Sequence, residues 1–203
     1  MKTPIYFITS TLLLFACTQS TISTNKQKRE QLATDTIRKI EDQLPYSIHT
    51  HKLFILSDAE KIMGEPAHLT DSTYKNKGQA PGFKDSMSIY KNEAATYSIG
   101  YMANAKDIKT EKIGNFYFTY EDYPQLSSAK KVYTYYKTAN EKNGIEVLHN
   151  IGDEAYFHTD KKNFYFIMVR KVNVVFNMKV NKITSKTSLE EFNRVAKRIS
   201  SKM

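Results

Sequence analysis

The chain has very little cysteine. Cys17 is the only one in 203 residues, and tryptophan is absent. A single thiol excludes an internal disulfide, so the folded part has to be stabilised by its own core. A domain of roughly 150 residues buries about two-thirds of the surface of its unfolded chain, which is sufficient without cross-links. The aromatic content of 12% also argues against a disordered chain.

Recognisable catalytic motifs are missing as well. The seven glycines are scattered singly, so no glycine-rich loop is present to cradle a phosphate. The sequence contains neither a G-x-S-x-G nucleophile elbow nor an H-E-x-x-H zinc motif. We therefore expect no catalytic residues, no metal ion and no cofactor. A Ser/His/Asp arrangement assembled from distant residues is the alternative that motifs do not test.

The apolar stretch at the N-terminus is too short to cross a membrane. It covers residues 5–15, eleven positions, and follows the positive charge of Lys2. A spanning helix needs roughly 20 apolar residues, whereas a secretory signal peptide needs only such a short run. We therefore predict that residues 1–16 are a signal peptide.

The predicted signal peptide ends at Ala16, within the sequence LFAC at residues 14–17. Leu-x-Ala-Cys resembles the lipobox of bacterial lipoproteins, with Phe15 larger than the residue usual there. The resemblance implies cleavage between Ala16 and Cys17 and attachment of fatty acids such as palmitate to Cys17. Two or three acyl chains give stable anchoring, since each buried methylene contributes about 0.8 kcal/mol. The alternative is an ordinary signal peptide with a chance cysteine or a core cysteine.

The predicted anchor gives an extracytoplasmic, membrane-attached location. Thr18 stands where the inner-membrane retention signal of lipoproteins has aspartate, so an outer membrane is favoured if the source has one. Residues 17–28 are polar and have no apolar periodicity, which predicts a flexible tether that carries the lipid.

The charge balance is basic. The formal net charge is +9, from 30 Lys and Arg against 21 Asp and Glu. For an exported protein, an anionic membrane surface or acidic glycan is a more plausible partner than nucleic acid. The lysines are scattered, however, and KQKR at 26–29 is the one dense run. General surface charge is therefore the simpler interpretation.

Hydrophobic periodicity predicts two helices in the first third of the domain. Residues 29–44 have an apolar stripe at helical spacing that stops at Pro45. Ser57 and Glu60 have the spacing of a capping box and predict a short helix that ends at Gly64.

Two more helices are predicted later in the chain. Ser127 or Ser128 would cap a helix that closes at Gly144. A second capping box, Ser188 with Glu191, would open the C-terminal helix. The expected apolar side of this last helix consists of Leu189, Phe192, Val195, Ala196, Ile199 and Met203.

Strands are predicted between the helices. One weak strand is expected within the polar segment 70–85. Alternation and β-favouring composition predict further strands over 94–102, 115–123, 145–157, 163–170 and 172–180. The third of these should be broken or bent at Gly152. In the last, Val172, Val174, Phe176, Met178 and Val180 fall on one face.

This order of elements predicts an α+β fold in one domain, residues 29–203. Hairpins dominate its second half, so the sheet should be largely antiparallel, with five to seven strands covered by helices.

The order of motifs resembles the PsbP-like α+β fold group, and more narrowly small bacterial lipoproteins of that shape with no assigned activity. Three short stretches carry the resemblance, Ile62–Pro66, Ile151–Phe157 and Ser188–Ile199. It implies an α/β/α-type sandwich with a binding or assembly role and gives no catalytic residues. The family often has a glycine in the following hairpin, whereas residues 170–173 have none.

Two groups of acidic and histidine side chains are candidate binding residues. Asp153 and Glu154 beside Gly152 could bind a cation, and His149 and His158 flank them. The simpler interpretation is a turn, in which the glycine permits the bend and the aspartate bonds its own backbone.

A second histidine pair lies earlier in the chain. His49 and His51 would lie on one side of an extended segment and could share zinc, with His68 as a loose third ligand. Ordinary surface histidines are the simpler interpretation of this pair too.

Tyrosines offer another candidate surface. Tyr133 and Tyr136 share the expected inward side of the middle helix, whereas Tyr135 points elsewhere. With Tyr117, Tyr120 and Tyr123, exposed rings could contact a sugar or a protein. Packing in the core and on the sheet is the simpler interpretation.

The sequence thus predicts a lipid-anchored, non-enzymatic cell-envelope protein that acts as a binding or assembly module. Its partners would be the membrane and an envelope protein or glycan, and not nucleic acid. One alternative is an envelope hydrolase or metal-dependent enzyme. Another is a binder of anionic glycan or of the membrane surface, which would gather its lysines on one face.

Overall fold

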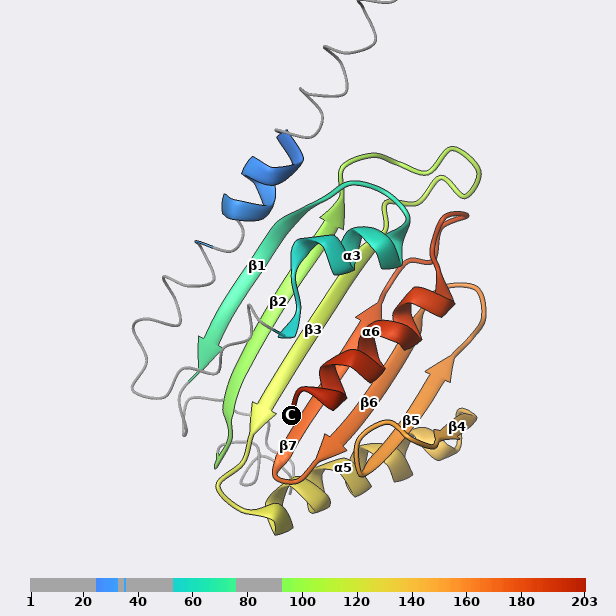
Figure 1. Cartoon of the computed structure of the whole chain (residues 1–203). Coiled ribbons are helices and arrows are strands. Elements are labelled where there is room, and N and C mark those ends of the chain that lie inside the picture. The colour runs from blue at the N-terminus through green and yellow to red at the C-terminus, as the bar shows by residue number, and fades with distance from the viewer. Residues whose placement is uncertain (1–24, 33–34, 36–52, 76–92) are drawn as a thin grey trace, which may run out of the picture.

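The computed structural model describes residues 25–32, 35, 53–75 and 93–203 (Figure 1). The predicted signal peptide, the lipidation site at Cys17 and the pair His49 and His51 lie outside these ranges. Within them, no helix is both long and apolar enough to span a bilayer.

The described strands form one antiparallel sheet, which confirms the predicted α+β fold class. Seven strands pair in the order β1-β2-β3-β7-β6-β5-β4. Their bounds are β1 Ala67–Lys75, β2 Ala95–Ala103, β3 Asn115–Asp122, β4 Ile145–Leu148, β5 Glu154–Thr159, β6 Tyr165–Lys171 and β7 Val174–Val180. Every neighbouring pair is antiparallel, so two meanders, β1-β2-β3 and β4-β5-β6, meet on either side of β7.

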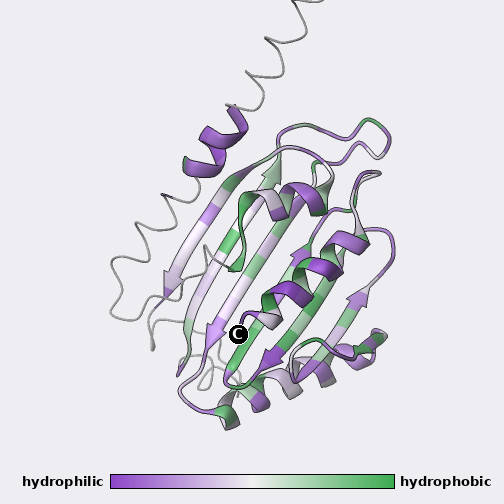
Figure 2. Cartoon of the chain, viewed as in Figure 1, coloured by the Kyte–Doolittle hydropathy of each residue, from purple (hydrophilic) through white to green (hydrophobic). Residues whose placement is uncertain are grey.

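Helices cover both faces of this sheet. Helices α3 (Leu56–Met63) and α6 (Leu189–Ser201) lie on one face, and α5 (Leu126–Glu141) lies on the other (Figure 1). In Figure 2, α3 and α6 present hydrophilic residues outward, while the strands beneath them contain hydrophobic segments. The chain therefore buries two separate apolar layers, one on each side of the sheet.

Strand alternation assigns residues to the two layers. In β7, Phe176 and Met178 pack in the larger core under α3 and α6, whereas Val175 faces α5. In β5, Tyr156 faces α5 and Phe157 faces the larger core. Because successive side chains point to opposite faces, a strand buried on both sides reads as a continuous apolar run.

The C-terminal helix begins where the sequence predicts. The Oγ of Ser188 accepts a hydrogen bond from the backbone N–H of Glu191 at 3.1 Å. The Glu191 carboxylate instead pairs with Arg194 within the helix, so only half of the capping box is present. Of the predicted apolar side, Leu189 is 38% exposed, and four residues are fully buried, Phe192, Val195, Ala196 and Ile199.

The predicted cap of α3 at Ser57 is wrong. The helix begins at Leu56 after the N-cap residue Ile55, whose N–H donates to the Asp58 carboxylate at 3.1 Å. Glu60 turns away from the cap and accepts a bond from the N–H of Ala67 at 3.2 Å. An acidic residue three positions after the N-cap therefore caps the helix, in a register two residues earlier than predicted.

The helix α5 also begins earlier than predicted. Its N-cap residue is Gln125, and Ser128 lies inside the first turn, where its Oγ donates to Glu93 at 2.7 Å.

Residues 25–32 are helical too, so the helix predicted from Arg29 already includes the last part of the predicted tether.

The predicted strand 172–180 loses its first two residues to a turn. Val172 is 53% exposed and has φ +51°, and Lys171 pairs directly with Val174 across a two-residue hairpin. A positive φ is unusual for a β-branched residue. Val172 therefore adopts, in this turn, a backbone conformation that glycine accommodates more readily.

Candidate functional site

The G-D-E sequence joins the start of β5 to the β6–β7 hairpin. The Asp153 carboxylate accepts bonds from the N–H of Val172 at 2.7 Å and from Arg170 Nη1 at 3.0 Å. Arg170 is 5% exposed and also donates from Nε to Glu154 at 2.5 Å. The Val172 N–H is the main cause that lowers the pKa of Asp153. Both carboxylates thus hold the hairpin turn together.

Gly152 makes this junction possible. Its φ is +64°, and the N–H of the next residue, Asp153, donates to the Arg170 carbonyl at 2.8 Å. The backbone of the turn therefore lies directly against β6. This geometry accounts for the glycine and the acidic residues as one structural unit.

The histidines do not gather around these carboxylates. His149 is an exposed residue of the β4–β5 turn. His158 lies four residues along β5 from Glu154, about 13 Å at the usual rise per residue, and its Nδ1 is 2.9 Å from the Gly144 carbonyl oxygen. His68 Nδ1 is 2.7 Å from the side-chain oxygen of Asn104. The described ranges contain no cluster of three or more His, Cys, Asp or Glu able to hold a metal.

Three of the six candidate tyrosines are buried, namely Tyr120, Tyr123 and Tyr133, whereas Tyr117 is 38% exposed. Tyr123 and Tyr133 are 1% and 2% exposed, and burial raises the pKa of Tyr120 to about 12. Tyr135 is 39% exposed and packs edge-on against the ring of Tyr136 at 5.5 Å. The tyrosines therefore contribute mainly to the two cores and do not form one aromatic strip.

Sequence reasoning missed a different cluster, made by three loops at one end of the sheet. Residues 104–114 connect β2 to β3, residues 160–164 connect β5 to β6, and residues 181–187 follow β7. We call these three loops the lysine-rich end. They contain seven lysines, Lys106, Lys109, Lys112, Lys161, Lys162, Lys182 and Lys186, and three acidic residues, Asp107, Glu111 and Asp160.

Hydrogen bonds fasten the three loops to one another. Ser185 Oγ donates to Asp107 at 2.7 Å, and the N–H of Ile183 donates to the Asn163 carbonyl at 2.9 Å. Lys112 Nζ donates to the side-chain oxygen of Asn163 at 3.2 Å. The lysine-rich end is therefore one connected surface.

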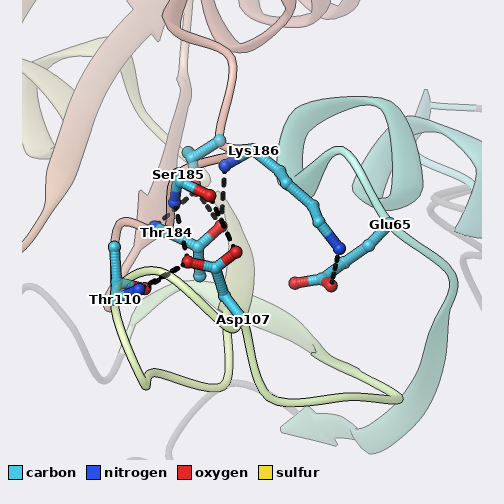
Figure 3. A network of polar contacts seen from close by, with 7 residues as sticks. Glu65, Asp107, Thr110, Thr184, Ser185 and Lys186 are labelled. Carbon is cyan, nitrogen blue, oxygen red and sulfur yellow. Dashed lines mark hydrogen bonds and ion pairs between the residues drawn. The ribbon is translucent and has the colours of Figure 1, made fainter.

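Asp107 is the centre of this network (Figure 3). Its side chain accepts bonds from the N–H and Oγ1 of Thr110 at 2.9 and 2.6 Å, and from the N–H and Oγ of Ser185 at 3.2 and 2.7 Å. The residue is 2% exposed. The Thr110 hydroxyl is the largest cause that lowers the pKa of this carboxyl, followed by the Ser185 hydroxyl.

The Asp107→Asn variant is expected to melt several degrees lower than the parent at neutral pH, because one amide oxygen cannot accept all four bonds. Since folding lowers the pKa of Asp107, its stabilisation is complete above the unfolded pKa of about 4 and is lost as the pH falls below it. The difference in melting temperature should therefore shrink between pH 7 and pH 3, as followed by circular dichroism. The matched control is Asp71→Asn on the exposed part of β1, which should melt like the parent. A difference independent of pH would contradict this role for Asp107.

The acidic residues of the lysine-rich end are engaged locally. Asp160 accepts bonds from the backbone N–H groups of Lys162 and Asn163 at 3.0 and 2.7 Å, and Glu111 pairs with Lys106 at 3.7 Å. Among the described turns at the other end of the sheet, 123–125, 149–153 and 172–173 contain one formally charged residue, Asp153. Of the turns that the structure describes, those of the lysine-rich end therefore carry the greater positive charge.

An open pocket of about 410 Å³ lies in this end. Its lining contains three lysines, two amides and one carboxylate, namely Lys106, Lys112, Lys182, Asn163, Asn181 and Glu111, together with Ile113. Ammonium and amide N–H groups are donors, so the pocket is suited to an anionic group such as a phosphate.

Ile108 is the most unusual residue of this surface. It is 95% exposed, although isoleucine is among the residues most often buried in proteins. It lies in the turn closed by the bond from the Glu111 N–H to the Asp107 carbonyl at 2.8 Å, and Lys109 follows it. An exposed apolar side chain is therefore held in a turn that also carries Lys109, with Lys106 just before it.

Comparisons with known proteins find no match for this chain, whether among protein-family models, curated proteins or solved structures. The likeness to PsbP-like lipoproteins therefore depends on the three short stretches of sequence alone.

Proposed function

We propose that this protein is a lipid-anchored component of a bacterial cell envelope, where its α+β domain acts as a binding or assembly module and not as an enzyme. The observation that carries the proposal is the LFAC sequence ending at Cys17, behind a short apolar run and before a polar tether. This combination supports the attachment of fatty acids to Cys17, the one thiol of the chain.

The arrangement of the domain supports a binding role. Asp153 and Glu154, the candidate cation ligands of the sequence analysis, are bonded to Arg170 and Val172 in the hairpin junction. The surface with unusual chemistry is instead the lysine-rich end, which offers donors and two exposed apolar side chains, Ile108 and Ile113. Such a surface is suited to recognising an anionic partner.

Metabolic labelling tests the anchor. In cells fed a fatty-acid analogue, the full-length protein is expected to incorporate the label, and Cys17→Ala is expected to lose all of it and to leave the membrane fraction. The neighbouring variant Thr18→Ala should keep both properties, which controls for general effects on export. Equal labelling of the parent and Cys17→Ala would refute the proposal.

A further inference from the structure

We propose that the lysine-rich end docks onto an anionic phospholipid bilayer, with Ile108 inserted among the headgroups. This inference rests on the proposed lipid anchor and identifies the surface of the domain that faces the membrane. The first support is chemical. Peripheral membrane segments combine a basic surface with apolar side chains that enter the headgroup region. Ile108 provides the apolar residue, and Lys106 and Lys109 lie on either side of it.

The second support is the rigidity of the loop that presents Ile108. The preceding residue, Asp107, is buried and bonded to Thr110 and Ser185, so the turn cannot fold Ile108 back onto the domain without breaking these bonds. An exposed apolar side chain on a fixed turn keeps its position ready for a bilayer. It also avoids the entropy cost of ordering a loop on contact.

The third support is charge. The seven lysines of the lysine-rich end outnumber its three acidic residues, and two of these lysines, Lys106 and Lys186, pair with Glu111 and Glu65. Long lysine side chains can place their ammonium groups at phosphate level while their stems cover apolar surface. The pocket between Lys106, Lys112 and Lys182 would receive one lipid phosphate.

The fourth support is the position of the tether. Asn25 and Arg29 line a pocket together with Glu65 and Pro66, in the turn between α3 and β1. Glu65 pairs with Lys186 of the lysine-rich end at 3.2 Å. Residues 25–32 and the three loops therefore lie toward the same end of the sheet (Figure 1).

The length of the intervening chain limits how far this end can be from the membrane. Eight residue steps separate Cys17 from Asn25. Even a fully extended chain of that length spans at most about 29 Å. Asn25, which lies toward the same end of the sheet as the lysine-rich end, is thus within about 29 Å of the lipid to which Cys17 would be attached. An acidic glycan would satisfy the lysines but would give no use for Ile108, which is why we favour a bilayer.

A fluorescent probe at position 108 tests the docking. If Cys17 is acylated, an introduced cysteine is the only free thiol, so Ile108→Cys in the full-length lipidated protein can be labelled specifically with the environment-sensitive dye NBD. The labelled protein is added to vesicles of phosphatidylcholine alone and of phosphatidylcholine with 30% phosphatidylglycerol (about one anionic lipid in three, a strongly negative surface). We expect a blue shift of NBD emission and quenching by spin-labelled lipid in the anionic vesicles. Ser127→Cys, exposed at the start of α5, should show neither.

Charge-matched variants of the Ile108→Cys protein give a second test. Lys106→Glu with Lys109→Glu should abolish the blue shift at position 108. Lys130→Glu with Lys197→Glu, which changes the net charge equally at exposed positions of α5 and α6, should retain it. Equal loss in both pairs would show that only total charge matters and would overturn the docking surface.

The remaining outcomes separate the docking from the anchor. Mass spectrometry of the same sample measures the fatty acid on Cys17. An acylated protein with no spectral shift at position 108, or with equal shifts at positions 108 and 127, overturns the docking and leaves the anchor intact. A protein without fatty acid overturns the proposed function. If soluble heparin binds the lysine-rich end while position 108 stays solvent-exposed on anionic vesicles, the surface is a glycan site and the docking proposal is wrong.

Discussion

Replacing Gly152 with alanine is expected to lower the free energy of unfolding by about 3 kcal/mol or more. Two costs add. A left-handed φ, here +64°, costs an L-residue about 1–2 kcal/mol. An added Cβ would also lie 2.5 Å from Val169 Cγ1 and 2.6 Å from the Arg170 carbonyl oxygen, so strand β6 would have to move. Displacing a packed core costs about 1–3 kcal/mol more.

Gly144→Ala is the matched control for this prediction. Gly144 also has a positive φ, +77°, but an added Cβ would meet no atom within 4 Å. Only the backbone cost of about 1–2 kcal/mol should therefore appear. Urea denaturation of both variants measures the difference, and equal losses of stability would show that the contact with β6 is unimportant.

Replacing Arg170 with alanine is the second large effect, and we expect it to cost about 2 kcal/mol. The guanidinium is 5% exposed and bonds to Asp153, to Glu154 and to the Val172 carbonyl oxygen. Removing one partner of a fully buried ion pair costs about 3–5 kcal/mol. The carboxylate side chains here are 34% and 43% exposed, so water compensates for part of the loss.

Lys137→Ala is the control for a surface ion pair. Lys137 pairs with Glu141 one turn along α5, at 3.6 Å, and both side chains are partly exposed. Its loss should cost about 0.3–0.5 kcal/mol. Urea denaturation again provides the measurement. An Arg170→Ala variant as stable as Lys137→Ala would mean that the hairpin junction does not depend on the guanidinium.

Much of the fold could be predicted because local and global preferences agree. The alternation from Val174 to Val180 predicts a strand, and β7 occupies these residues. Ser188 lies at the N-cap of α6 because its hydroxyl has a free N–H to bind three residues later. In both cases the residues of one short segment are sufficient to determine its conformation.

The errors arise where two local solutions compete. Ser57 is a good N-cap residue, but the nearby Phe54 is buried against two aromatic rings. The centroid of its ring lies 4.5 Å from that of Phe116 and 5.6 Å from that of Phe118. Packing of the residues around Phe54 coincides with a helix start at Leu56, and Asp58 is then correctly placed to bond the N–H of Ile55. Core packing outweighs the preference of a single serine, because the cap contributes only about 1 kcal/mol.

The lysine-rich end could not be read from sequence spacing because its members come from three loops up to about 80 residues apart. Antiparallel pairing alone brings these loops together, since β2, β5 and β7 all terminate at the same end of the sheet. The strand order, which no local pattern provides, was needed first. Once that order is known, the charges of the connecting loops can be compared directly from the sequence.

The position of β7 in the sheet determines when the chain can complete its fold during synthesis. The strand is the last in the sequence but lies in the middle of the sheet, between β3 and β6. Until residues 174–180 are available, the two meanders have no strand to join them, and each has an open edge facing the other. Sheets that depend on such distant pairings form slowly. A chain that emerges during synthesis therefore remains without its complete sheet until residues 174–180 are available.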